Sequence, residues 1–142
     1  MVSSDTTGLH QKTFDPPVGR LIGFRVTHAE NGQATVEIDV DERHANPMGT
    51  LHGGILCDIA DMAMGAALVS SLQPDETFTT LEMKINFLRP VWKAKLFAMG
   101  KVVKGGHTVS LVECDVFDNE LKLIARASST CLTLRGDQAG GR

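Results

Sequence analysis

Two groups of residues in this 142-residue chain could do chemistry, and both belong to one long apolar segment. His52-Gly53-Gly54 opens the segment, which runs to about Leu72. The first backbone N–H groups of a helix have no intrahelical acceptor, and glycine lets a ligand approach them closely. With the partial positive charge of a helix start, they suit a developing oxyanion. Taken alone, however, the glycine pair is explained at least as well by close packing against a sheet.

The second group is the pair of carboxylates Asp58 and Asp61, the only charged side chains of that segment. A carboxylate in an apolar helix loses hydration, so it needs a hydrogen-bonding or charged partner unless it has a functional role. A single buried aspartate usually binds a backbone N–H or a basic side chain. An oxyanion-type helix start and an unexplained acid on the same helix favour catalysis, with Asp61 as the acid and Asp58 as a structural residue.

The spacing of Gly53 and Asp61 adds a condition. Eight residues correspond to about 12 Å along a helix, whereas a reacting carbonyl needs both groups about 3 Å away. One helix cannot place both on one carbonyl. The hypothesis therefore predicts an obligate dimer in which Gly53 of one chain faces Asp61 of the other across a two-fold axis.

The remaining pattern predicts the elements that position this helix. Alternating apolar residues indicate strands, with Leu81, Met83, Ile85 and Phe87 expected on one face of the first strand after the helix. Asn31-Gly32 is suited to a tight hairpin turn. The strands are expected at about residues 21–30, 34–41, 79–88, 94–104, 108–117 and 121–134. One helix against a run of antiparallel strands is an α+β arrangement.

The ends and the bulk composition limit the other function classes. We expect an N-terminal extension over 1–18, one domain over 19–135 and a flexible tail over 136–142, with the residues to about 15 frayed.

A net charge of −3 gives no pull towards nucleic acid or an anionic membrane. Two carboxylates in mid-segment argue against a membrane span. Three isolated cysteines and no secretory signal predict a cytoplasmic protein.

The string N-P-M-G-T-L-H-G-G from Asn46 to Gly54, with Asp61 nine positions after His52, resembles the hotdog-fold thioesterases of the phenylacetate-degradation (PaaI) type. The resemblance covers residues 19–135. It implies a hotdog fold, with a sheet of about six strands wrapped around one long central helix. It also implies an acyl-CoA thioesterase that needs no cofactor, since coenzyme A is part of the substrate. The implied assembly is a homo-oligomer with active sites at the dimer interface, a tetramer formed as a dimer of dimers.

The resemblance also implies roles for particular residues. Asp61 would act as nucleophile or as general base on water, and the Gly53 N–H would polarise the thioester carbonyl. Asn46 and His52 would orient the carbonyl or the water, and Thr80 would place a hydroxyl near the carboxylate. His52 could instead be the general base, or could fix the loop by bonding to backbone. The remaining histidines are scattered, so we expect no metal site.

Coenzyme A phosphates would need positive charge, and the chain has six basic and no acidic residues between Glu82 and Glu113. Lysines that discourage edge pairing would explain part of this excess. The resemblance points to two stretches beside the ligand. The residues expected there are Phe87, Arg89 and Pro90, then Lys104, Gly105, Gly106, His107 and Thr108.

Two other functions remain open at this point. A hotdog dehydratase or hydratase acting on acyl thioesters would use a different pairing of histidine and acid, which is absent here. A non-catalytic acyl-CoA-binding protein would share the fold without needing Asp61. The acyl group is also open, because a lining that includes Met48, Met62, Met64 and Leu68 would accept aryl or aliphatic chains.

Overall fold

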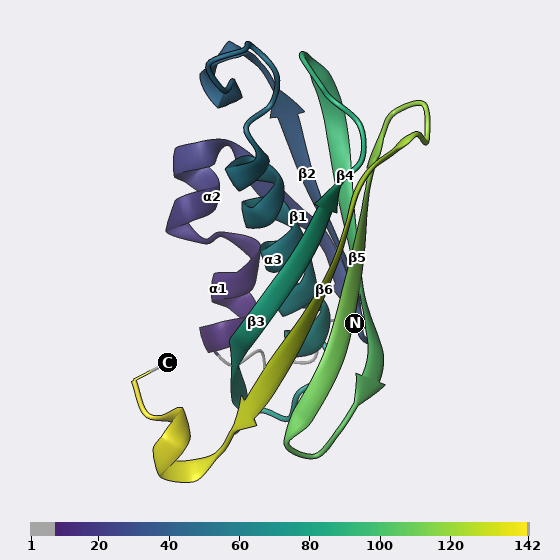
Figure 1. Cartoon of the computed structure of the whole chain (residues 1–142). Helices are drawn as coiled ribbons and strands as arrows, with labels where there is room; N and C mark the ends of the chain where they lie inside the picture. Colours follow the sequence, from purple (N-terminus) through teal and green to yellow (C-terminus); the bar gives the residue numbers. More distant parts are fainter. Residues whose placement is uncertain (1–7, 142) are drawn as a thin grey trace.

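The computed structural model describes residues 8–141, apart from the side chain of His10. Three helices lie on one side of a six-stranded sheet, with α3 against the sheet and the shorter α1 and α2 beyond it (Figure 1). The helices are α1 (Gly8–Phe14), α2 (Pro17–Ile22) and α3 (Gly53–Val69). The strands are β1 (Phe24–Glu30), β2 (Gln33–Val40), β3 (Thr77–Phe87), β4 (Ala94–Gly105), β5 (Val109–Asp118) and β6 (Leu123–Leu134). Two 3-10 turns complete the chain, η1 (Glu42–His44) and η2 (Gly136–Ala139).

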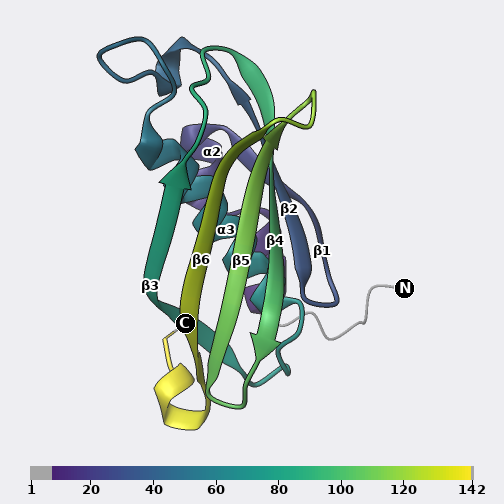
Figure 2. The same ribbon diagram turned by 45° about the vertical axis from the view of Figure 1, so that its right-hand side comes forward.

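The sheet is antiparallel throughout, in the order β1-β2-β4-β5-β6-β3. Asn31 and Gly32 join β1 to β2 with positive φ at both positions, as the predicted tight hairpin requires. β1 and β3 are therefore the two edges of the sheet, and β3 stands at the outer side of the sheet in Figure 2. The predicted α+β hotdog arrangement is confirmed.

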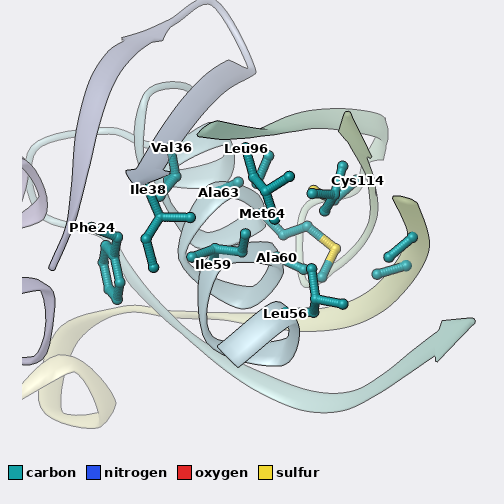
Figure 3. Packing of buried hydrophobic residues seen from close by; sticks show 14 of the residues in the cluster. Phe24, Val36, Ile38, Leu56, Ile59, Ala60, Ala63, Met64, Leu96 and Cys114 are labelled. Atoms are coloured by element: carbon teal, nitrogen blue, oxygen red, sulfur yellow. The ribbon is translucent and has the colours of Figure 1, made fainter. Parts of the chain in front are cut away.

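α3 packs its apolar residues into the concave face of the sheet, where Ile59, Ala63 and Met64 meet residues of β2 and β4 (Figure 3). Small residues bring the two layers together. A Cβ at Gly100 of β4 would clash with the carbonyl of Ala63, so the strand touches the helix backbone directly. This contact fixes the depth of α3 in the sheet, and with it the place of every side chain on the helix.

α3 ends three residues before the predicted limit at Leu72. The hydroxyls of Ser70 and Ser71 donate to the carbonyls of Ala67 and Leu68, so the chain leaves the helix there. Serine side chains that bond back to nearby carbonyls offer the backbone an alternative to further helix. No helix among residues 8–141 is both long and apolar enough to cross a membrane.

A β-bulge in β3 corrects the predicted alternation of that strand. The register between β3 and β6 shifts between Thr80 and Glu82, and Leu81 is 57% exposed instead of facing the helix. Met83 and Ile85 do pack on the core, as predicted. Because the bulge inserts one residue, Thr80 before it and Met83 after it both face α3.

The N-terminal region is more ordered than we expected. Residues 8–14, predicted to be frayed, form α1, whose Phe14 packs on the core. The first strand begins at Phe24 and not at Leu21, because Gly23 (φ 99°) ends α2 in a left-handed conformation. The short helix α2 begins directly after Pro16, with Pro17 as its first residue. Residues 1–7 of the predicted extension lie outside the described residues, and the predicted tail begins with η2.

Candidate active site

The start of α3 presents one backbone donor. His52 is the N-cap residue, and its Nδ1 accepts the Gly54 N–H at 2.8 Å. The N–H of Gly53, one residue earlier, has no acceptor among residues 8–141. Since Nδ1 is an acceptor, the ring proton of neutral His52 lies on Nε2. His52 therefore fixes the loop to the helix, and the helix start keeps one donor for a ligand.

Asn46 organises the loop that leads to this helix start. Its Oδ1 accepts the N–H groups of Met48 at 2.9 Å and Thr50 at 3.1 Å. Its Nδ2 donates to the Thr50 hydroxyl at 2.7 Å, which leaves one further amide hydrogen. The side chain is thus held rigidly, as a group that positions a substrate needs to be.

The Gly53 donor opens into a hollow of about 400 Å³. Phe87, the last residue of β3, lies against Gly53 so closely that a Cβ there would be 2.9 Å from its Cζ. A larger residue at position 53 would therefore displace the ring or the helix start. The hollow is lined by Asn46 and Gly53 together with Phe87, Arg89 and Pro90, so the structure brings five of the predicted residues together.

Asp61 lies further along α3, opposite the start of β3. The Thr80 hydroxyl, on the residue that precedes the bulge at Leu81, donates to Asp61 Oδ1 at 3.4 Å. Solvent reaches the side chain in the single chain. Even so, the surrounding protein raises the pKa of the Asp61 carboxyl by desolvation, and the Thr80 hydrogen bond acts in the opposite direction. A carboxyl whose pKa is raised in this way binds a proton more readily than an ordinary aspartate, which suits a group that takes a proton from water.

A second hollow, of about 250 Å³, opens at Asp61 and Thr80. Its lining is largely apolar and comes from three elements. Sequence reasoning missed the part contributed by α1, including Leu9 and Thr13, and the part contributed by Phe78. A seven-residue helix without a capping motif leaves no clear signal in the sequence, because its stability comes from packing.

The two hollows are separate within one chain. α3 runs without a break from Gly53 to beyond Asp61, so the two groups stay about 12 Å apart along its axis. Neither Asp61 nor Thr80 lines the hollow at Gly53, and Gly53 does not line the hollow at Asp61. The predicted residues therefore form two half-sites.

The second predicted coenzyme A stretch lies at the other end of the sheet. Gly105 and Gly106 line a hollow with Leu68 near the C-terminal end of α3, and Arg135 donates to the His107 carbonyl at 2.6 Å. Lys104 and Thr108 flank this turn and are exposed. Within one chain, this stretch does not meet the Gly53 half-site. Across residues 8–141, no three His, Cys, Asp or Glu side chains converge as a metal ion would require.

Comparison with known proteins now gives the family. Residues 48–125, which include the end of the loop, α3 and Thr80, match the model of the thioesterase superfamily. The chain belongs to the thioesterase superfamily. It is accordingly a thioester hydrolase, and the predicted membership of the hotdog thioesterases is confirmed.

Individual relatives agree with this assignment. A protein of Saccharolobus solfataricus is 38% identical over 117 residues, which cover 82% of each chain. The 1,4-dihydroxy-2-naphthoyl-CoA hydrolase of Listeria monocytogenes is 28% identical over 109 residues, 77% of this chain and 89% of that one. Among solved structures, a mutant of the phenylacetic acid degradation protein PaaI from Thermus thermophilus is similar with a TM-score of 0.75 and 26% identity. That similarity covers 82% of this chain and 97% of PaaI.

Proposed function

We propose that this protein hydrolyses acyl-CoA or aryl-acyl-CoA thioesters to the free acid and coenzyme A, in active sites shared by two chains. The observation that carries the proposal is the division of the site into two hollows. One holds an unoccupied backbone donor at Gly53, and the other holds the carboxylate of Asp61. Hydrolysis of a thioester needs both the backbone donor and the carboxylate, and each hollow contains only one of them.

The surface between the half-sites supports pairing of two chains. β3 is an edge strand, with unpaired backbone groups along one side. Exposed apolar side chains follow it, including Leu81 (57% exposed) and Phe87 (55% exposed). The adjoining face of α3 carries Asp58 and Asp61, which the chain itself does not cover fully. A two-fold axis at this edge would run the two α3 helices antiparallel and bring Gly53 of one chain to Asp61 of the other.

In such a site, the Gly53 N–H would receive the charge that develops on the thioester oxygen. Asp61 of the other chain acts either as the nucleophile or as the general base. As nucleophile, it adds to the carbonyl carbon and expels the coenzyme A thiolate, and water then cleaves the mixed anhydride. As general base, it takes a proton from a water molecule whose oxygen adds to the same carbon, and the thiolate leaves with a proton. Both routes consume one water and release the acid and the thiol.

The proposed assembly also unites the two coenzyme A stretches. Phe87, Arg89 and Pro90 lie at the Gly53 end of the chain, and the turn Lys104–Thr108 lies at the opposite end. A two-fold axis that exchanges the ends of α3 would carry the partner's turn towards the first chain's Gly53 hollow. The pantetheine would then leave the carbonyl along Phe87, and the phosphates would reach Lys104 of the partner.

A dimer of dimers is part of the proposal. Apolar side chains are exposed on the face of the sheet away from α3. They are Met99 and Val103 of β4 and Leu111 of β5, and Val103 lies beside Leu111. Exposed apolar patches of this kind mark association surfaces. Sedimentation equilibrium of the natural protein, compared with a Met99→Lys Leu111→Lys variant, should show a tetramer reduced to an active dimer.

The test of the reaction is thiol release from a panel of acyl-CoAs by the natural protein, Asp61→Asn and Asp58→Asn. Asp58 is the matched control, since it lies three residues away on α3 and burial raises its pKa as well. We expect Asp61→Asn to lose at least about a thousandfold in kcat and Asp58→Asn to stay within a few fold. Equal rates for Asp61→Asn and the natural protein would remove Asp61 from the mechanism. Negligible rates for the natural protein across the panel would favour a binding protein.

A further inference from the structure

We infer that α1 forms a wall of the acyl-binding pocket, and that the side chain of Leu9 limits the length of the acyl group that the protein hydrolyses. This inference rests on the proposed function, because it takes Asp61 to be the group beside the thioester carbonyl. The α1 helix lies outside residues 48–125, which match the family model.

The pocket begins at the proposed reacting centre. Asp61 and Thr80 stand at one side of the 250 Å³ hollow, and its other residues are mostly apolar. The tip of the Phe78 ring of β3 lies against α3 at Gly65, where a Cβ would be 2.9 Å from its Cζ. Together with Met62 they form an apolar floor next to a carboxylate, which suits the hydrocarbon part of an acyl group whose carbonyl stays at Asp61.

α1 supplies the opposite wall. Leu9 and Thr13 are four residues apart, so they lie on one face of the helix, and both line the hollow. The Thr13 hydroxyl donates to the Leu9 carbonyl at 2.8 Å. Its hydrogen bond is thereby satisfied within α1. The half-buried Leu9 is the largest apolar side chain of this wall, and the exposed Lys12 is its only charged residue.

Contacts of Phe14 and of the adjoining helix α2 attach α1 to the rest of the fold. Phe14, at the end of α1, packs on the core. The next helix, α2, is fixed at its C-terminal end by His44, whose Nε2 bonds the Ile22 carbonyl at 2.7 Å. Gly19 of α2 packs on Phe24, where a Cβ would be 2.9 Å from the carbonyl oxygen. α1 is therefore attached to the rest of the fold at its C-terminal end.

The volume indicates the size of the acyl group. A cavity of about 150 Å³ holds benzene, so 250 Å³ holds on the order of ten carbon atoms. An arylacetyl group or an octanoyl chain fits within this limit, whereas a dodecanoyl chain exceeds it. The substrate class is thus aryl and medium-chain acyl thioesters.

The experiment measures kcat/KM for a series from hexanoyl-CoA to dodecanoyl-CoA with the natural protein, Leu9→Ala and Leu9→Phe. We expect the ratio of dodecanoyl to octanoyl activity to rise about tenfold in Leu9→Ala and to fall by a similar factor in Leu9→Phe. Leu21→Ala is the control, because this leucine of α2 is 83% exposed and does not line the hollow. Its profile should match that of the natural protein.

The outcomes separate the two levels of the proposal. Hydrolysis by all variants with the same length profile would overturn the role of α1 and leave the thioesterase proposal in place. A shift towards longer chains in both Leu9 variants would show that α1 had merely detached, and would also overturn the size limit. No hydrolysis by the natural protein would overturn the proposed function itself.

Discussion

Replacement of Gly53 by alanine perturbs the helix start without removing its N–H. The added Cβ would lie 2.9 Å from Phe87 Cζ, whereas carbon atoms pack at about 3.5 Å or more, so the ring or the helix start must move by about 0.6 Å. A misplacement of about 1 Å at a catalytic group can cost about a hundredfold in rate. We therefore expect kcat/KM for octanoyl-CoA to fall by roughly ten- to a hundredfold.

The cause of that loss can be separated from simple blocking of the ligand. If the contact between the new Cβ and Phe87 is responsible, Gly53→Ala combined with Phe87→Ala should be about as active as Phe87→Ala alone. Such a cycle measures the coupling between the two positions. The assay is thiol release under steady-state conditions, with thermal unfolding to confirm that each variant is folded. Full activity of Gly53→Ala, or a double variant whose loss is the product of the two single losses, would refute the reasoning.

Three further predictions concern pH and stability. Thr80→Val removes the donor that lowers the pKa of Asp61, so the acidic limb of the pH profile of kcat/KM should move to higher pH; an unmoved limb would contradict the contact. A carboxyl whose pKa is raised by folding disfavours the folded state where it is ionised, so Asp61→Asn should raise Tm at neutral pH. This gain should disappear as the pH falls through the folded pKa of Asp61, and a pH-independent gain would argue for another cause. Gly100→Ala forces a Cβ against the Ala63 carbonyl and should cost about 1–3 kcal/mol in urea unfolding. Gly105→Ala on the same strand meets only ordinary contact and should stay within about 0.5 kcal/mol.

The parts of the fold that the sequence predicted are those with strong periodicity or strict turn chemistry. The alternation over β2 and the Asn31-Gly32 turn predict a hairpin, and the structure has it. The glycine pair after His52 marks the start of α3 correctly, because a helix start needs a cap and room. These signals come from residues that are neighbours in the sequence, so they can be recognised without knowledge of contacts between distant parts of the chain.

The features that were missed depend on contacts between distant parts of the chain. The bulge at Leu81 is fixed by the pairing of β3 with β6, and no residue type within β3 predicts it. α1 owes its place to the core contact of Phe14 and to the hydrogen bond between His44 and α2. Both features lie at the Asp61 hollow, so the sequence predicted the proposed reacting groups but not the α1 side chains that line the hollow beside Asp61.

The shared active site is the central claim, and subunit mixing tests it most directly. Proline is tolerated at the first position of a helix, and His52 already has the extended backbone (φ −66°, ψ 133°) that proline requires before it. Gly53→Pro therefore removes the donor and, like Gly53→Ala, also places a Cβ close to the Phe87 ring. Mixed with Asp61→Asn, it should form hybrid dimers in which one site combines an intact Gly53 with an intact Asp61.

Random exchange of equal amounts should then restore about one quarter of the natural activity, although each variant alone is inactive. The control is a double variant that carries Gly53→Pro and Asp61→Asn in the same chain, so that neither of its half-sites is intact. Mixed with the natural protein, it should leave about one quarter of full activity if sites are shared, and about one half if each chain works alone. Recovery to one quarter in the first mixture is the predicted result. No recovery after confirmed subunit exchange would contradict a site built from two chains.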